Sequence, residues 1–190
     1  MIADGEHSSP LQQEVLKRRC VLNIRRAELG DVPALFEMIN HYAAEGIMLR
    51  RTLTELYECV REFLVAEDGG KVVGCGALKF YAADLAEIRS LCVAPGLQAR
   101  GVGRALTERL LSEAEQYGLK TVFALTVAPD FFQKCGFREM ARERFPAKIW
   151  RDCLRCERYF HCNEKTMVID LPTSPGDRNE PCAEESEITA

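Results

Sequence analysis

The sequence lacks an apolar stretch long enough to cross a membrane. Hydrophobic residues make up 47% of its 190 residues, but no apolar run approaches the about 20 residues that a membrane-spanning helix needs. The first ten residues are polar and contain nothing like the apolar core of a signal peptide. We therefore expect a cytoplasmic protein that has no membrane partner.

The sequence also lacks a surplus of either charge. It contains 25 lysines and arginines against 29 aspartates and glutamates, for a net charge of −4. The acidic excess falls within residues 172–190, so the rest of the chain is balanced. A general nucleic-acid binder needs an excess of cations to displace counterions. The balance argues against nucleic acid as a partner.

Internal repeats are absent, and the composition changes only near the two ends. Residues 1–20 are polar with a basic finish and predict a flexible N-terminal arm. Residues 172–190 are rich in proline, serine and acidic residues and predict a disordered acidic tail. The stretch between them, residues 21–171, has the length of one globular domain.

Strand-like and helix-like patterns alternate within this domain. Apolar residues at helical spacing predict helices beginning at Asp31 and Gly101, with shorter helices at Thr52 and Asp130. We expect strands at residues 22–26, 63–66, 71–81, 85–93, 120–127, 137–141 and 165–171. This order predicts an α/β (α+β) fold, with a mixed, mostly antiparallel sheet and helices on both faces.

The segment between the fourth expected strand and the long helix reads VAPGLQARGVGR, over residues 93–104. A helix start exposes backbone N–H groups and the positive end of the helix dipole. Gly101 and Gly103 would let a phosphate approach the backbone closely, and Arg100 and Arg104 add positive charge. The segment therefore predicts a diphosphate-binding loop.

Two well-known phosphate loops do not fit this segment. A Rossmann loop needs a third glycine where Leu106 stands, and a P-loop needs a Gly-Lys-Ser/Thr sequence that is absent. The whole string, V-x-P-x-x-Q-x-x-G-x-G-x-x-L, resembles the acetyl-CoA motif of the GNAT acetyltransferases. The resemblance extends over about residues 22–171 and includes the FQKCGF turn at residues 132–137.

The resemblance implies a GNAT fold whose sheet is splayed between strands 4 and 5, with acetyl-CoA as co-substrate. Its pantetheine arm would lie in that gap and bond to the backbone of Leu91, Cys92 and Val93. An N–H near Cys92 would polarise the thioester carbonyl, as an oxyanion hole does. The diphosphate would be held by the loop, which consists of Gln98, Ala99, Arg100, Gly101, Val102, Gly103 and Arg104.

Acetyl transfer to an amine also needs a base, because an amine is mostly protonated at neutral pH. Glu87 lies on the fourth expected strand, where the family resemblance also places a glutamate that acts as a base. We expect Glu87 to have this role. The alternative is a solvated surface pair of Glu87 and Arg89.

Many family members carry a tyrosine that protonates the leaving thiolate, and this sequence has Phe132 in its place. A tyrosine acid is therefore not expected at that position. Cys92 raises the alternative of an acetyl-cysteine intermediate; the other interpretation of Cys92 is a buried apolar thiol.

Several cations fall in segments that should line the acceptor side. We take Arg50, Lys79, Arg89 and Lys148 as candidate substrate-binding residues, with a solvated surface charge as the alternative for each. Two separated cation sites suit a substrate with two carboxylates, since arginine binds a carboxylate bidentately.

Four short strings resemble the acetyltransferase domain of the N-acetylglutamate synthases. The resemblance implies that Arg50 holds the α-carboxylate of L-glutamate, that Lys79 assists, and that the Lys148 region holds the distal carboxylate. The product would be N-acetylglutamate, for arginine biosynthesis. We expect no amino-acid-kinase domain of the kind that often precedes this domain. The strings lie at residues 45–52, 74–79, 86–93 and 145–148.

Other functions stay open at this point. The acceptor could be another amino acid or a protein N-terminus, and a non-catalytic acyl-CoA-binding sensor is an alternative of a different class. A homodimer is also left open.

The sequence contains nine cysteines, and three of them gather near the C-terminal end of the domain. Cys153 and Cys156 have the spacing of a zinc half-site, but adjacent residues such as His161 and Cys162 rarely face one metal. We expect no metal, with a thiol-rich loop as the simplest interpretation. A zinc site and a reversible disulfide remain the alternatives.

Overall fold

The computed structural model describes residues 22–156 and 158–172. The expectations for the N-terminal arm and for the tail from residue 173 onward lie outside this range. The described chain divides into two compact units. Unit 1 holds residues 22–79 and 88–110, and unit 2 holds residues 80–87 and 111–172. Within the described residues, no helix is long and apolar enough to span a membrane.

Seven strands pair in the order β1-β2-β3-β4-β5-β7-β6. The β4–β5 pair is parallel, whereas β1–β2, β2–β3, β5–β7 and β6–β7 are antiparallel. The predicted fold class, a mixed and mostly antiparallel sheet with helices, is confirmed. The strands are β1 (Asn23–Arg26), β2 (Phe63–Asp68), β3 (Lys71–Ala82), β4 (Leu85–Val93), β5 (Thr121–Thr126), β6 (Arg138–Met140) and β7 (Lys165–Asp170).

The parallel ladder between β4 and β5 is short. It joins Leu85–Glu87 to Thr121–Phe123, and β4 continues to Val93 beyond its last pair. Ser90 adopts a left-handed conformation, with φ of 52°, within this continuation. The second half of β4 is therefore an irregular strand whose backbone is not used in that ladder.

All four helices that the sequence predicts are present. They are α2 (Val32–Ala44), α3 (Leu53–Glu58), α4 (Val102–Gln116) and α5 (Pro129–Lys134). The sequence analysis did not predict α6 (Pro146–Arg151), a helix too short to show an apolar period. Single 3-10 turns are η1 (Leu29–Asp31), η2 (Val60–Glu62), η3 (Arg142–Arg144), η4 (Cys153–Arg155) and η5 (Tyr159–His161).

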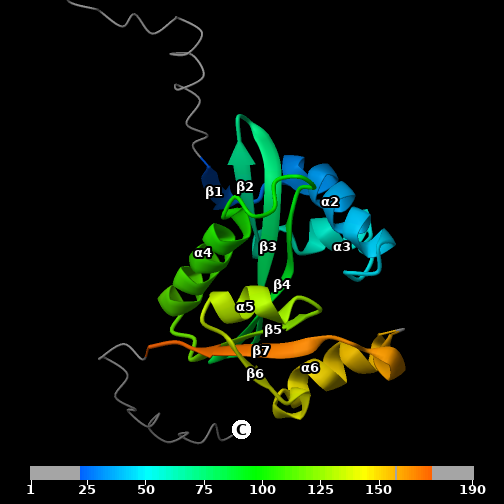
Figure 1. The fold of residues 1–190 in the computed structure, drawn as a ribbon, viewed down its shortest axis with the longest axis vertical. Helices are drawn as coiled ribbons and strands as arrows, with labels where there is room; N and C mark the ends of the chain where they lie inside the picture. Colours follow the sequence, from blue (N-terminus) through cyan, green and yellow to red (C-terminus); the bar gives the residue numbers. More distant parts are fainter. Residues whose placement is uncertain (1–21, 157, 173–190) are drawn as a thin grey trace, which may run out of the picture. The chain divides into compact units, whose positions relative to one another are not determined.

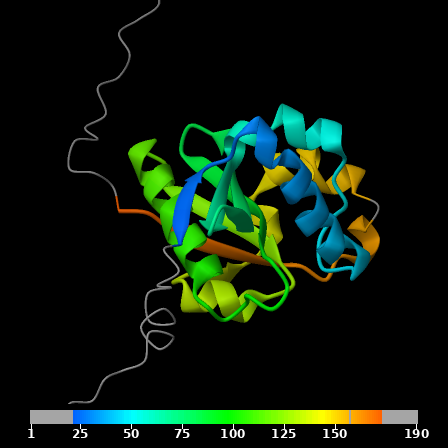
Figure 2. The same cartoon turned by 90° about the horizontal axis from the view of Figure 1, so that it is seen from above.

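In unit 1 the strands carry helices on both faces (Figures 1 and 2). Phe63, Val65, Cys75 and Ala77 belong to the core cluster that also contains the apolar side of α2 and Leu56 of α3. The opposite face of β3 is lined by glycine. A Cβ at Gly74 would lie 3.0 Å from Val102 Cγ1 of α4. The missing side chain therefore lets the start of α4 pack closely on β3.

In unit 2 the strands β5 and β7 carry aromatic packing on one face and α5 on the other. Phe123 stacks on Phe145 with ring centroids 4.5 Å apart, and Val168 joins this cluster. The next residue, Ile169, faces the opposite side, where its Cδ1 would lie 3.6 Å from a Cβ at Gly136. The stack fixes Phe145, the residue from which α6 begins.

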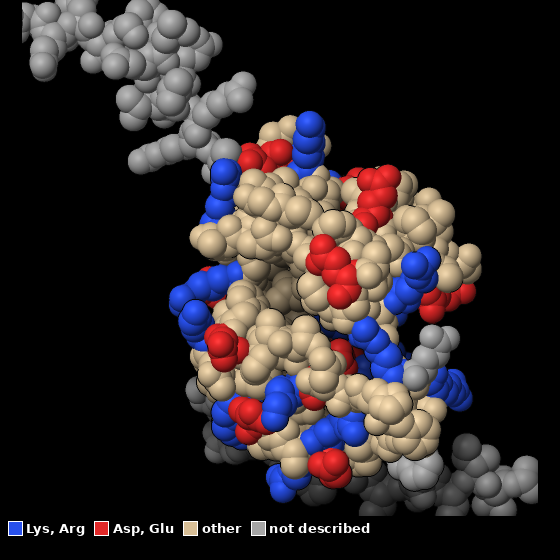
Figure 3. Space-filling view, turned by 45° about the vertical axis from the view of Figure 1, so that its right-hand side comes forward, with Lys and Arg blue, Asp and Glu red and all other residues tan. Residues whose placement is uncertain are grey.

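The described surface carries both signs of charge. Figure 3 shows lysines and arginines interspersed with aspartates and glutamates across the face that it draws. This distribution agrees with the balanced composition of the domain.

Candidate active site

The loop between β4 and α4 has an unusual backbone. Gly96, Ala99 and Gly101 all have left-handed φ angles, of 80°, 65° and 81°. A Cβ at Gly96 or Gly101 would meet nothing within 4 Å, so the backbone there borders open space. A backbone of this kind can turn its amide groups outward toward an anion.

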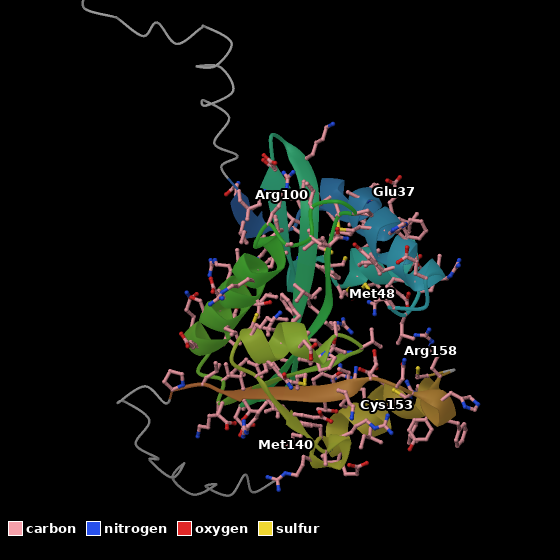
Figure 4. All side chains as sticks on the ribbon, viewed as in Figure 1. Glu37, Met48, Arg100, Met140, Cys153 and Arg158 are labelled. Carbon is pink, nitrogen blue, oxygen red and sulfur yellow. The ribbon has the colours of Figure 1, made fainter. Side chains whose placement is uncertain are left out.

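The loop leads directly into the N-terminus of α4. The Ala105 N–H donates to the Gly101 carbonyl at 2.9 Å, which is a hydrogen bond between residues four apart, as in an α-helix. The backbone N–H groups of residues 102–104 lie before this bond, at the start of the helix, where such groups lack a partner within the helix. Arg100 is exposed in the loop, at the place labelled in Figure 4. Arg104 lies one turn further and pairs with Glu108 at 2.8 Å. These amides and Arg100 suit a diphosphate.

Gln98, which the sequence predicts to contact the diphosphate, has its side-chain amide engaged inside unit 1. Its Oε1 accepts from Gly96 N–H at 2.8 Å. Its Nε2 donates to the Tyr42 hydroxyl oxygen at 2.7 Å. The side chain therefore holds the loop together, and its neighbours supply the open backbone.

The Cys92 side chain points into the core of unit 1. It is 7% exposed, and its Sγ lies 3.5 Å from Cys75 Sγ. The hydrogen bond to Cys92, together with burial, raises the pKa of Cys75 well above its ordinary value. The arrangement favours a buried apolar thiol over an acetyl-cysteine.

Glu87 is buried at the end of the β4–β5 ladder, in unit 2. Lys148 Nζ lies 2.9 Å from each of its carboxylate oxygens and 3.0 Å from Asp152 Oδ2. The Tyr81 hydroxyl donates to Asp152 and lies 2.9 Å from Glu87 Oε2. Arg89 instead pairs with Glu62 at 2.6 Å. The alternative of a solvated Glu87–Arg89 surface pair is therefore wrong.

This buried cluster contains two carboxylates and one ammonium. Burial lowers the pKa of Lys148, but the charge and hydrogen bonds of Glu87 and Asp152 outweigh that effect and raise it. Burial, followed by the charge of Glu87, raises the pKa of Tyr81 far above its ordinary value. Lys148 is therefore charged and Tyr81 neutral at physiological pH.

The sequence analysis missed three members of this neighbourhood. Tyr81 and Asp152 were not selected, although Asp152 lies four residues after Lys148, a spacing at which side chains meet on a helix. Glu164 was also missed; burial raises its pKa, and its Oε2 lies 3.7 Å from Cys162 Sγ. Nothing in the local sequence marks Tyr81, whose partner Asp152 is 71 residues away.

The candidate acceptor-binding cations outside this cluster lie in unit 1. Arg50 is exposed, whereas Lys79 is half-buried on β3. Arg51, which follows Arg50, is held by Asn40 through both its backbone N–H and its carbonyl, at 3.1 and 2.8 Å. Its Nε is buried and has no hydrogen-bond partner among the described residues. Arg51, whose Nη2 also lies 3.4 Å from Cys59 Sγ, is therefore the more firmly fixed of the two arginines.

The cysteines near α6 are free thiols where the structure describes them. Cys153 is buried in η4 (Figure 4), and burial raises its pKa. No group of three histidine, cysteine or acidic side chains within the described ranges is arranged to hold a metal ion. The disulfide alternative stays a prediction.

The comparisons with known proteins agree on one family. Residues 60–139 match the family described as the acetyltransferase (GNAT) domain. The chain is 42% identical to an uncharacterized N-acetyltransferase of Chlorobaculum tepidum, over 78% of this chain and 96% of that protein. It is 41% identical to an amino-acid acetyltransferase of Mycobacterium tuberculosis, over 73% of this chain and 80% of that protein.

Two solved structures extend the likeness to three dimensions. Rv2747 of M. tuberculosis, crystallised in complex with CoA and NLQ, is 35% identical with a TM-score of 0.69, over 79% of this chain and 99% of that one. N-acetylglutamate synthase of Neisseria gonorrhoeae, complexed with coenzyme A and N-acetyl-glutamate, is 30% identical with a TM-score of 0.73. That match covers 82% of this chain and 36% of the longer synthase chain. The motif, the fold and these relatives agree: this chain belongs to the GNAT acetyltransferases.

Proposed function

We propose that this protein transfers the acetyl group of acetyl-CoA to the α-amine of an amino acid, with L-glutamate as the acceptor and N-acetylglutamate as the product. The observation that carries the proposal is the open, left-handed loop that leads into α4. The relatives named amino-acid acetyltransferase support the acceptor class. The N. gonorrhoeae structure, with coenzyme A and N-acetyl-glutamate, supports glutamate in particular.

Acetyl-CoA is held by the two segments at the ends of the loop. The backbone of Leu91, Cys92 and Val93 bonds to the pantetheine arm, because this half of β4 lies beyond its last pair with β5. The amides at the start of α4 and the Arg100 guanidinium bind the diphosphate. An N–H near Cys92 stabilises the charge that develops on the thioester oxygen.

Glu87 is the proposed base. The amine attacks the thioester carbon, the C–S bond breaks, and Glu87 accepts the proton that the amine loses. Lys148 orients the Glu87 carboxylate by binding both of its oxygens. Phe132 is buried in α5 and offers no proton, so coenzyme A leaves as the thiolate, a good leaving group.

The acceptor's α-carboxylate is assigned to the Arg50–Arg51 pair. Arg51 contributes the buried Nε described above, and Arg50 contributes an exposed guanidinium. Lys79 and Arg89 are the further candidates in unit 1. An arginine pair suits a carboxylate because each guanidinium can bind both of its oxygens.

A second candidate acceptor is an amino acid with an uncharged amide side chain, such as glutamine. The observation that favours it is the state of Lys148, which already pairs with both Glu87 and Asp152. A third carboxylate at this ammonium would add negative charge to a buried cluster that already carries an excess of it. Lys148 is a less available partner for a distal carboxylate than the sequence suggests.

The experiment that tests the proposal measures release of the coenzyme A thiol from acetyl-CoA. The acceptor panel contains L-glutamate, L-glutamine, other amino acids and a peptide with a free N-terminus. Turnover with glutamate supports the proposal, and faster turnover with glutamine supports the second candidate. Turnover with the peptide alone, or CoA binding with no turnover on any acceptor, would overturn it.

A further inference from the structure

Three hydrogen bonds in series tie the diphosphate loop to α2. The Tyr42 hydroxyl donates to the Val93 carbonyl at 2.6 Å. Gln98 Nε2 donates to the Tyr42 oxygen at 2.7 Å, and Gln98 Oε1 accepts from Gly96 N–H at 2.8 Å. Each polar atom acts in a role that its chemistry allows, since a phenol can donate once and accept as well. The series runs unbroken from the end of β4 into the loop.

Tyr42 is itself firmly held. It lies in the last turns of α2 and packs against the core of unit 1, with an edge-to-face contact to the His41 ring at 5.2 Å. Burial raises its pKa, so the hydroxyl stays protonated and can donate throughout the neutral range. The tyrosine therefore provides a fixed point on the helical scaffold.

The loop needs such a fixed point. Gly96 and the residues from Gln98 to Gly101 are exposed, and Ala99 adopts a left-handed φ that residues other than glycine rarely take. Gln98, itself exposed, carries the hydrogen bonds just described, which tie this segment to α2. Hydrogen bonds that act in series hold a polar segment in one conformation.

We propose that Tyr42 is a positioning residue for the diphosphate of acetyl-CoA. It acts through Gln98, whose side chain fixes the loop so that the amides leading into α4 are arranged for the anion before it binds. This inference rests on the proposed function and adds to it a residue in α2 that lies outside the glycine motif.

The test compares Tyr42→Phe with the wild type on two donors that share the thioester. Acetyl-CoA carries the diphosphate, and acetyl-pantetheine does not. We expect kcat/KM for acetyl-CoA to fall about tenfold, mainly through KM, because two hydrogen bonds are lost. We expect kcat/KM for acetyl-pantetheine to fall by about twofold at most, because only the bond to the Val93 carbonyl bears on the pantetheine-binding backbone. The affinity for coenzyme A in calorimetry should fall by the same factor as kcat/KM for acetyl-CoA.

Two further variants make the result specific. Tyr57→Phe removes the hydroxyl of an exposed tyrosine on α3 and should change neither donor. Gln98→Ala should match the effect of Tyr42→Phe, and the double variant should be no worse than Gln98→Ala, because the two residues act in one series. A thermal melt of each variant checks that the fold is intact.

Equal losses on both donors would reduce Tyr42 to a structural residue and overturn the inference. An unchanged KM for acetyl-CoA, or additive effects in the double variant, would also overturn it. A wild type that uses both donors equally well would contradict diphosphate binding by the loop and overturn the inference, whereas a wild type that turns over neither donor would contradict the proposed function.

Discussion

Glu87 is the side chain on which the proposed chemistry depends most directly. It is 3% exposed and lies against an ammonium, a second carboxylate and a phenol. Its place on the fourth strand could be predicted from strand alternation and the family resemblance. Its partners could not, because Tyr81, Lys148 and Asp152 meet it through contacts far apart in sequence.

Replacing the proposed base tests its role. Glu87→Gln should lower kcat by about a hundredfold or more, while the calorimetric affinity for coenzyme A should stay within about twofold, since Glu87 has no part in the diphosphate loop. The glutamine keeps the volume and one acceptor oxygen. A kcat that equals the wild-type value at every pH would remove Glu87 as the base.

Lys148 holds the buried Glu87 and the half-buried Asp152 carboxylates, so its removal leaves both uncompensated. Lys148→Met should lower the free energy of unfolding by about 3 kcal/mol at neutral pH, measured by urea denaturation. Arg104→Met is the matched control: its ion pair with Glu108 is exposed, so the same measurement should show a change below about 1 kcal/mol. Equal effects of the two substitutions would contradict the buried pairing.

Glu164 gives a prediction about pH. Burial raises its pKa in the folded state, so the folded protein binds this proton more tightly than the unfolded chain does. Stability from this group is therefore present at low pH and is lost as pH rises from about 4.5 through the folded pKa. Glu164→Gln should remove that loss, so the variant gains stability over the wild type at pH 7 but not at pH 4, in urea titrations. A variant less stable than the wild type at pH 7 would contradict this.

The packing of α4 on β3 explains how the diphosphate loop is placed within unit 1. A Cβ at Gly76 would lie 2.9 Å from Leu91 Cδ1 and 3.0 Å from Leu110 Cδ1. The glycines of β3 therefore keep the second half of β4 and the start of α4 in close contact with one strand. The helix itself could be predicted from its apolar period, but its distance from β3 depends on tertiary packing.

Gly76→Ala should disturb this contact. We expect a loss of about 1–3 kcal/mol in the free energy of unfolding, because the added methyl overfills a packed site. We also expect weaker coenzyme A binding, because Leu91 belongs to the proposed pantetheine-binding backbone. Gly30→Ala is the control, since a Cβ there would meet nothing within 4 Å. A Gly76→Ala variant as stable as the wild type would contradict this, because it would show that the Leu91 and Leu110 side chains move aside at no cost in stability.

Short elements were the hardest to predict. The strands and the longer helices follow from periodicity, and the capping pair Thr52 and Glu55 marks the start of α3 in both sequence and structure. The six residues of α6 carry no such signal. Because α6 presents Lys148 to Glu87, the main gap in the sequence-based site was this one short helix.

For the whole chain, the order of strands and helices and one long motif were enough to predict the fold class. The family resemblance then gave the enzyme class, which the relatives confirm. Which acceptor the site can bind depends on a few side chains whose charges compensate one another. Lys148 is an example, because Glu87 and Asp152 already compensate its charge. Sequence patterns do not reveal such compensation, because it arises only when distant residues are brought together.

The central claim is that the loop entering α4 binds the diphosphate of coenzyme A. Calorimetric titration of the purified protein with coenzyme A, and separately with pantetheine, tests it most directly. We predict that coenzyme A binds at least about a hundredfold more tightly than pantetheine, since only the former offers a diphosphate to the loop. Equal affinities for the two ligands, or no binding of coenzyme A, would contradict the claim.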